Sequence, residues 1–410
     1  PTSGSSKTGA VATDLLTVNN GYHYVAAQGF NGNDNAGMYA NFGQRPFTYT
    51  APTGYQTLCT KNLPDPAIQL SNNHFEAELY TGTGSAQNIT GLEFQPDWVW
   101  CKNRSNTNRH ALFDSVRGVT KRLASDRTDT ETADPDTLTS FNSNGFSIGA
   151  DTGEYGVNQN GSNFVSWNWK GGGSASSNSD GDITSQVSAN TSAGFSIVGY
   201  TGNGTSNSDV TIGHGLGVTP AMVIIKKRDS GGSEGQWGVL HQKLTSGKNI
   251  FLQTYTGEGT YTNYIKSMQS TTFTIRLSDA SAGRYNRNGN NYIAYVFADV
   301  EGFSKFGSYV GNGNSNGAFI YLGFRPAFFL LKAKTSDISW YMYDNKRDPD
   351  NLVDKELNPH NTQSEASGHD LDFVSNGVKM RSSDSSLNYS NYEYIYWAFA
   401  ESPFKYARAR

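Results

Sequence analysis

Residues 323–334, GFRPAFFLLKAK, are the third copy of a pattern around which the whole chain is organised. The earlier copies are FQPDWVWCKNR at 94–104 and VTPAMVIIKKR at 218–228. In each copy a proline precedes a lysine by six positions, and mainly apolar residues lie between them. A short apolar run that starts at a proline and ends at a charge is typical of a buried β-strand, because helices need longer runs. Three such strands predict three copies of one domain.

The same order of elements surrounds each copy. Ahead of it lies an alternating strand that ends in a glycine turn, and we expect a hairpin-like pair at the start of each copy. Behind it come a further short segment and an aromatic closing strand. The opening strands lie at 75–84, 195–204 and 303–313, the middle segments at 138–148, 270–275 and 371–380, and the closing strands at 163–170, 291–299 and 393–401.

The composition favours an all-β protein. The 410 residues include 45 glycines, 23 tyrosines and 22 phenylalanines, and only 17% of the residues are charged. Long stretches with helical periodicity are missing from the sequence, and this turn-rich composition is typical of β-proteins. We therefore predict tandem antiparallel β-sandwich repeats of jelly-roll or concanavalin-like type, each with a core about 10 Å thick. We expect a separate apolar core in each repeat.

The charge pattern disfavours several classes of partner. The formal net charge is −4, without a basic stripe for nucleic acid. No apolar run approaches the roughly 18 residues of a membrane-spanning helix, so we expect no membrane span. The seven histidines stand singly and lack the spacing of zinc sites, so we predict no metal and no cofactor.

The two cysteines, Cys59 and Cys101, give little information about the fold. They could form a disulfide only if the N-terminal segment folded against the first repeat. A thiol inside the apolar strand WVWCK is more often a small core residue, and this is the interpretation we favour for Cys101.

Several motifs in combination resemble repeat modules of tailed-bacteriophage structural proteins, particularly those of marine phages. They include FQPDWVWCKNR, LFDSVRG, LTSFNSNGFSIG, WNWKGGG and the C-terminal YWAFAESPFKYARAR. The pair GFSIVGYTGNGT and GHGLGVTP looks like the start of such a module, and NFGQRPFTYTAPTGYQTL resembles the closing strands of a SPRY-like sandwich. The resemblance implies a virion protein of the tail or another exposed surface, and it carries no set of catalytic residues.

These patterns predict five parts of the chain. Residues 1–69 form an N-terminal β arm or the end of a SPRY-like sandwich. Residues 70–172, 182–300 and 301–410 form β-sandwich repeats 1, 2 and 3. The Gly/Ser-rich stretch at 173–181 is predicted to be a flexible linker, so repeats 1 and 2 should be joined more loosely than repeats 2 and 3.

An acidic residue and an arginine three positions later occur in two of the repeats, as Asp114 with Arg117 and as Asp344 with Arg347. The second repeat has GVLHQKLTSG at this place and lacks the pair. We interpret each pair as an ion pair that ties down a loop. A ligand site is the alternative.

A polysaccharide depolymerase would need two carboxyl groups held across a sugar. The segment after the first core strand is rich in acidic residues, but it is also rich in Ser and Thr, so we expect these carboxylates to be solvated and predict no catalytic residues. The candidates are Asp126, Asp129, Glu131, Asp134 and Asp136.

Loops rich in Tyr, Asn, Gly and Ser combine planar rings with adaptable hydrogen-bonding groups, which suits weak contact with sugars or proteins. An equally available interpretation is that these tyrosines cover the sandwich ends or contact other subunits. The candidate binding residues are Tyr255, Tyr261, Tyr264, Tyr285 and Tyr292.

The sequence thus favours a non-enzymatic virion structural protein, a tail fibre, spike or other exposed appendage that contacts the host surface and its glycans. Repetition supports this expectation, since several weak sites on one particle give avidity. We expect other virion proteins as partners and a homo-oligomer, trimeric if the protein is a fibre. The alternatives are a capsid-decorating or baseplate assembly protein without a host ligand, and a polysaccharide depolymerase.

Overall fold

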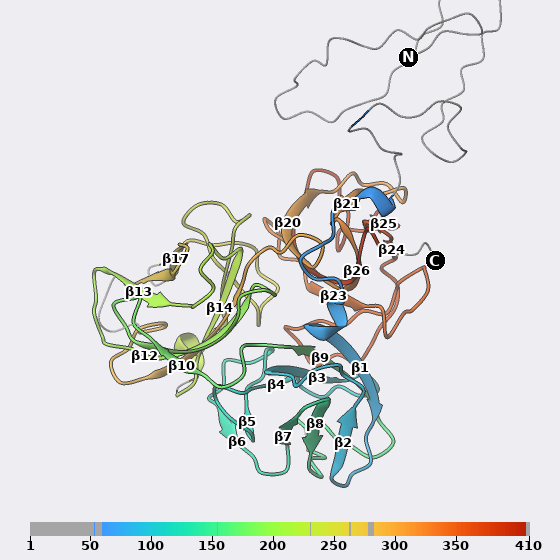
Figure 1. Ribbon diagram of the computed structural model, residues 1–410. Coiled ribbons are helices and arrows are strands. Elements are labelled where there is room, and N and C mark those ends of the chain that lie inside the picture. The colour runs from blue at the N-terminus through green and yellow to red at the C-terminus, as the bar shows by residue number, and fades with distance from the viewer. Residues whose placement is uncertain are drawn as a thin grey trace, which may run out of the picture. The chain divides into compact units, whose positions relative to one another are not determined.

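The computed structural model describes residues 53, 60–153, 155–229, 231–261, 264–277 and 283–406. The chain divides into two compact units, residues 1–62 and residues 63–410. The second unit contains all three copies of the repeat (Figure 1). In the first unit the described residues include a 3₁₀ helix, η1 (Thr60–Asn62). The predicted β arm up to residue 59, together with Cys59, lies outside the described residues.

The first module is a two-layer antiparallel sandwich. Its inner sheet has the strand order β1-β9-β3-β4, its outer sheet has the order β2-β8-β7, and β5 pairs with β6 in a short ribbon. A 3₁₀ helix, η2 (Ser71–Asn73), precedes β1. The strands are β1 (Phe75–Thr81), β2 (Gln87–Thr90), β3 (Trp98–Asn103), β4 (Ala111–Asp114), β5 (Lys121–Arg122), β6 (Thr132–Ala133), β7 (Leu138–Asn142), β8 (Gly145–Ile148) and β9 (Asn163–Trp169).

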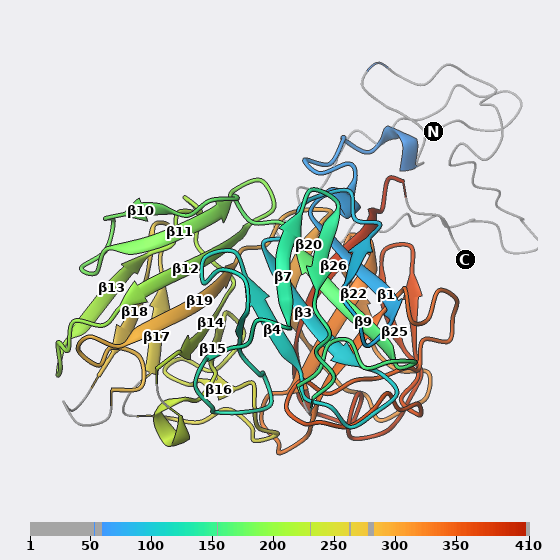
Figure 2. The ribbon, with the colours of Figure 1, turned by 90° about the horizontal axis from the view of Figure 1, so that it is seen from below.

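The second module repeats this arrangement with a longer inner sheet, in the order β10-β11-β12-β19-β14-β15-β16, which Figure 2 shows strand by strand. The outer sheet has the order β13-β18-β17, and a 3₁₀ helix, η3 (Gly232–Glu234), follows β14. The strands are β10 (Ser176–Asn178), β11 (Ser185–Asn190), β12 (Phe195–Thr201), β13 (Asp209–Gly213), β14 (Met222–Lys227), β15 (Gly238–His241), β16 (Ile250–Phe251), β17 (Tyr264–Met268), β18 (Thr272–Arg276) and β19 (Asn291–Phe297).

The third module has the inner order β20-β26-β22-β23 and the outer order β21-β25-β24. The prediction of an all-β fold built from antiparallel sandwiches is therefore confirmed. The strands are β20 (Ser304–Val310), β21 (Phe319–Tyr321), β22 (Phe324–Ala333), β23 (Trp340–Asp344), β24 (Leu371–Val374), β25 (Gly377–Met380) and β26 (Glu393–Pro403).

The three predicted core strands, β3, β14 and β22, occupy the same place in their modules and are buried along their whole length. Each lies between the closing strand and the next strand of its inner sheet. The closing strand also pairs with the opening strand, as in β1-β9-β3. The expected hairpin-like pair at the start of each copy is therefore wrong, because the closing strand lies between its two members.

The lysine that ends each core strand is buried and bound by backbone carbonyl groups. Lys226 Nζ donates to the carbonyl oxygens of Thr128 and Asp129 in the first module, at 3.0 and 2.8 Å. Lys102 Nζ donates to the carbonyl oxygen of Thr362 in the third module, at 3.3 Å. A buried ammonium needs such acceptors, because an unpaired buried charge is costly. Two of these lysines therefore join neighbouring modules.

The three modules share one apolar core. The inner faces of all three inner sheets contribute to a single cluster of buried residues. The ring centroids of Trp98 and Tyr295 are 4.3 Å apart between the first and second modules, and those of Phe75 and Phe399 are 5.0 Å apart between the first and third. The expectation of separate cores is only partly right, since the first and second modules each keep a smaller cluster between their own two sheets.

A cyclic set of hydrogen bonds closes the ring of modules. An aromatic side chain at or just before the start of β4, β15 and β23 reaches a backbone carbonyl oxygen of a neighbouring module. His110 Nε2 lies 2.9 Å from the Asn358 oxygen, Trp237 Nε1 donates to the Ala124 oxygen at 2.8 Å, and Trp340 Nε1 donates to the Phe251 oxygen at 3.2 Å. Module 1 thus contacts module 3, module 2 contacts module 1, and module 3 contacts module 2.

The segment predicted as a flexible linker is ordered by specific contacts. Its residues Ser176–Asn178 form β10, which pairs with β11. Just before it, the buried Asp97 carboxylate accepts a hydrogen bond from the Gly171 N–H at 2.8 Å. A Cβ at Gly172 would lie 2.4 Å from the Ala189 carbonyl oxygen, so only glycine fits there. The glycines serve close packing here, and the composition gave no sign of this.

Candidate functional site

The five tyrosines predicted to form a binding surface lie in different environments. Tyr285 and Tyr292 are fully buried. The Tyr292 ring stacks on Tyr200 at 4.9 Å, and its hydroxyl donates to the Gly283 carbonyl oxygen at 2.9 Å. These two residues belong to the core of the second module, which corrects their assignment to a surface site. They were misassigned because a glycine- and asparagine-rich neighbourhood does not reveal which tyrosines point inward.

The other three candidates remain accessible. Tyr255 is 56% exposed. Tyr261 is half-buried, with its ring 4.6 Å from that of Phe251, and Tyr264 is half-buried in β17. Their role in binding stays a prediction.

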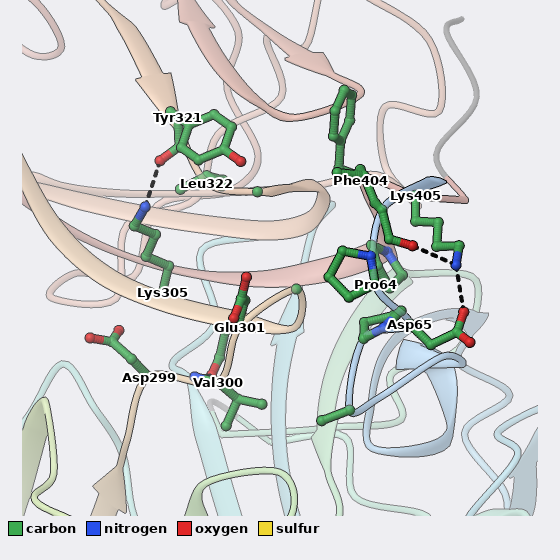
Figure 3. Close-up of a pocket in the computed structure, with 17 residues that line it drawn as sticks. Pro64, Asp65, Asp299, Val300, Glu301, Lys305, Tyr321, Leu322, Phe404 and Lys405 are labelled. Atoms are coloured by element: carbon green, nitrogen blue, oxygen red, sulfur yellow. Dashed lines mark hydrogen bonds and ion pairs between the residues drawn. The ribbon is translucent and has the colours of Figure 1, made fainter. Parts of the chain in front are cut away.

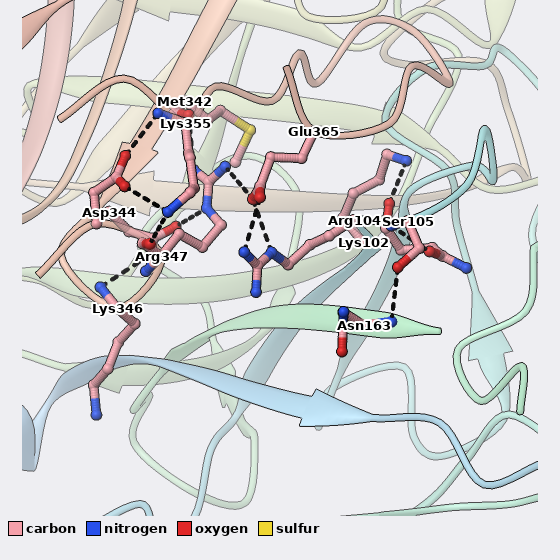
Figure 4. Close-up of polar contacts among 12 residues, drawn as sticks. Lys102, Arg104, Ser105, Asn163, Met342, Asp344, Lys346, Arg347, Lys355 and Glu365 are labelled. Atoms are coloured by element: carbon pink, nitrogen blue, oxygen red, sulfur yellow. Dashed lines mark hydrogen bonds and ion pairs between the residues drawn. The ribbon is translucent and has the colours of Figure 1, made fainter. Parts of the chain in front are cut away.

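The two Asp/Arg pairs do tie down loops, as predicted, and they also extend across module boundaries (Figure 4). Asp344 and Arg347 have fully buried side chains with 2.6 Å between carboxylate and guanidinium. Arg347 contacts Glu365 at 3.4 Å, and Glu365 accepts two hydrogen bonds from Arg104 of the first module, both at 2.8 Å. We call these four residues the 3–1 ionic chain.

The same arrangement joins the first and second modules. Arg117 pairs with Asp114 and lies 3.3 Å from Glu131, which accepts two hydrogen bonds from Arg228, both at 2.8 Å. In addition Tyr295 donates its hydroxyl hydrogen to Asp114 at 2.8 Å. We call Asp114, Arg117, Glu131 and Arg228 the 1–2 ionic chain. Because the charges in both chains are bound to each other, they offer no free group to a ligand.

At the boundary between the second and third modules, the residues that the structure describes form no ionic chain of this kind. His241 pairs with Met222 at the ladder position that Asp114 holds opposite Trp98, and its Nε2 lies 3.1 Å from the Tyr396 carbonyl oxygen. Lys243 N–H donates to His241 Nδ1 at 3.1 Å, so Nε2 carries the hydrogen. Burial lowers the pKa of His241 to about 4 and keeps the imidazole neutral.

The acidic segment considered for sugar cleavage is engaged by arginines. The side chain of Asp126, expected to be solvated, is buried and contacts Arg109 at 2.7 Å. Partial burial opposes ionisation of Glu131, but its arginine partners outweigh this effect and lower its pKa. A general acid needs a raised pKa, so Glu131 is unsuited to that role. Asp129 pairs with Arg127, and Asp134 pairs with Arg122. Asp136 is exposed.

A cleft of about 760 Å³ lies at the second-to-third module boundary, lined by parts of the segments 63–67, 299–305, 321–323 and 403–405. Its centre is the exposed carboxylate of Glu301, so we call it the Glu301 cleft. Figure 3 shows Glu301 between Lys305 on one side and Pro64 and Asp65 on the other. Within the part of the chain that the structure describes, the Glu301 carboxylate has no hydrogen-bond or ion-pair partner.

The walls of the Glu301 cleft are held by polar contacts. On one side Lys305 Nζ donates to the Tyr321 carbonyl oxygen at 2.9 Å and lies 5.1 Å from the centroid of its ring. On the other side Lys405 Nζ contacts Asp65 and the Leu63 carbonyl oxygen, each at 2.7 Å. These contacts join the start and the end of the second unit and fix the shape of the cleft.

No local pattern in the sequence predicts this site. Its residues come from four distant segments, and each segment alone has an ordinary composition. The recurrence of the repeat offers one usable signal, because the aromatic residues of Phe-Ile-Tyr at 319–321 have no counterpart in the equivalent strands β2 and β13.

The comparisons with known proteins identify a family. A family described as a domain of unknown function (DUF7483) matches residues 70–403, which include all three modules. The chain belongs to the DUF7483 family. No curated protein and no solved structure matches this DUF7483 chain. Among the residues that the structure describes, we find no helix with the length and apolarity needed to cross a membrane.

Proposed function

We propose that the DUF7483 chain is a non-enzymatic structural protein of a phage virion, located in a tail fibre, spike or other exposed appendage that contacts the host surface. Its repeated motifs, which resemble modules of tailed-phage structural proteins, support the location. Other virion proteins are its partners, and in a fibre the chain would form a homotrimer.

One observation carries the proposed contact with a ligand. Phe319 and Tyr321 face outward on β21, an edge strand of the outer sheet of the third module, and are 50% and 56% exposed. The equivalent positions of the first module hold Asn88 and Thr90, which pair with β8 as Phe319 and Tyr321 pair with β25. The fold therefore does not need aromatic side chains there, and exposed aromatic groups beside a cleft are typical of binding surfaces.

The test combines location with binding. Gold-labelled antibodies against the chain should decorate an appendage of intact particles, and the purified chain should bind host cells. Intact particles that carry no label would refute an exposed location. Label on the capsid or baseplate, together with no binding to cells, would instead favour the assembly protein.

The depolymerase is tested separately. Because the acidic residues of 126–136 are largely paired with arginines, we expect no release of reducing ends when the chain is incubated with host polysaccharide. Release that disappears on substitution of a carboxylate pair would refute the non-enzymatic proposal.

A further inference from the structure

The Glu301 cleft has the size of a small-ligand site. Pockets for small ligands measure roughly 300–1,000 Å³, and the cleft of about 760 Å³ falls inside that range. It is also concave, whereas most protein interfaces are flat. Its walls are held on two sides by the contacts of Lys305 and Lys405 described above.

The three modules provide an internal comparison. The edge strands β2, β13 and β21 pair in the same way with β8, β18 and β25. At the position of Tyr321 the other modules have Thr90 and Gly213, and at the position of Phe319 they have Asn88 and Thr211. Stability of the sandwich does not explain two half-exposed rings, because the other two modules fold without them.

The two rings form a row on the surface. Residues i and i+2 of a strand point to the same face, about 6.6 Å apart along the strand. Ile320 between them is buried, which confirms that Phe319 and Tyr321 face outward. Tyr321 lines the cleft, and Phe319 extends the row away from it. Such a row can stack against consecutive flat, partly apolar units of a chain-like ligand.

The polar groups in the cleft define the chemistry of that ligand. Glu301 is a free acceptor, and Lys305 is a donor that also binds the Tyr321 carbonyl oxygen. Asp299 accepts hydrogen bonds from Gln242 and Phe306 and adds a second negative charge at the rim. Asp65 and Lys405 neutralise each other, so two carboxylates remain against one ammonium group. Hydroxyl groups donate readily to carboxylates, whereas an acidic ligand would be repelled by the excess negative charge.

We propose that the Glu301 cleft and the rings of Phe319 and Tyr321 bind a short stretch of an uncharged, hydroxyl-rich polysaccharide. The sugar rings lie on the two aromatic side chains, and their hydroxyl groups donate to Glu301. This proposal rests on the proposed function, since a host-surface glycan is the ligand. An apolar protein segment fits less well, because five of the residues that line the cleft carry a charge.

The experiment uses the full 410-residue chain. Binding is measured on immobilised neutral glucans, galactans and mannans and on the acidic polysaccharides hyaluronan and alginate. We then expect Tyr321→Thr and Phe319→Asn, which install the residues of the first module, to weaken binding of the best neutral glycan about tenfold each. Glu301→Gln should weaken it less and should reduce the discrimination against the acidic polysaccharides.

Controls separate binding from folding. Val218→Thr removes a comparably exposed apolar side chain from the second module, away from the proposed site, and should leave binding unchanged. Each variant should show the urea midpoint of the wild type. Strong binding of acidic polysaccharides, binding that survives both Tyr321→Thr and Glu301→Gln, or no binding to any polysaccharide would each overturn the proposal.

The proposed function fails independently, when intact particles carry no antibody label. If the chain is exposed on particles but Tyr321→Thr reduces its incorporation and no polysaccharide binds, the cleft contacts a virion protein, and the polysaccharide proposal is wrong.

Discussion

Replacement of Asp344 by Asn tests whether the ionic chains hold the modules together. Asp344 accepts hydrogen bonds from the side chains of Arg347 at 2.6 Å and of Trp167, in the first module, at 3.0 Å. The substitution leaves the guanidinium of Arg347 buried without its main counter-charge, and breaking a buried pair in this way costs about 3–5 kcal/mol. Because Arg347 keeps Glu365 at 3.4 Å, we expect a loss near 3 kcal/mol.

The assay is urea unfolding followed by tryptophan fluorescence, because all seven tryptophans are fully buried. Two control variants define the scale. Asp209→Asn breaks two surface pairs, with Lys266 and with Arg276, and should cost less than about 1 kcal/mol. His241→Asn, at the equivalent position of the second module, removes the hydrogen bond between Nε2 and the Tyr396 carbonyl oxygen and should cost about 1 kcal/mol. An Asp344→Asn variant no less stable than these two controls would refute the structural role of the ionic chain.

The shared core predicts that residues 63–410 unfold in one calorimetric transition, and three resolved transitions would show that the modules are independent. The Glu356 carboxylate hydrogen-bonded to His369 at 2.5 Å raises the pKa of that histidine above its usual value of about 6.5, so the stabilisation is complete below pH 6.5 and is lost as the pH rises through the folded-state pKa. His369→Gln should therefore lower the urea midpoint more at pH 5.5 than at pH 9, and equal losses at both would contradict this assignment. Gly172→Ala should destabilise the fold by about 1–3 kcal/mol through the contact of its Cβ with the Ala189 carbonyl oxygen, whereas Ser174→Ala should be neutral in the same urea titration.

Much of the fold could be predicted from local patterns. The proline and lysine that bound each core strand located β3, β14 and β22, since a buried strand is recognisable from a short apolar run. The prediction for Cys101 was also right, because the residue is buried in β3, where burial raises the pKa of its thiol to about 12. Each of these features depends only on residues close together in the sequence.

The contacts between modules could not be predicted in this way. Trp167 and Asp344 are separated by 177 residues, and Arg104 and Glu365 by 261. These residue types occur at both exposed and buried positions, so neither composition nor periodicity reveals which residues pair. The prediction of a flexible linker at 173–181 is wrong for the same reason, since Gly173 donates a hydrogen bond to Asp97 and residues 176–178 pair with β11.

The site was missed because exposure is a property of the assembled sandwich. Tyr292 and Tyr321 each stand beside an isoleucine and close to a glycine in the sequence, yet the first is in the core and the second is 56% exposed. Only the register of β19 and β21 within their sheets distinguishes them. Alignment of the three repeats with one another would have supplied that register for the outer edge strands.

The closed ring of modules within one chain has a consequence for how such a protein can diversify. Three identical subunits around a symmetry axis must repeat every surface feature three times. Here a single polypeptide supplies all three modules, so each module boundary and each outer face can change without the other two. The histidine at one module boundary and the aromatic row on one outer face are changes of this kind. A gene that encoded a single module could not have produced either change without altering all three copies of that module.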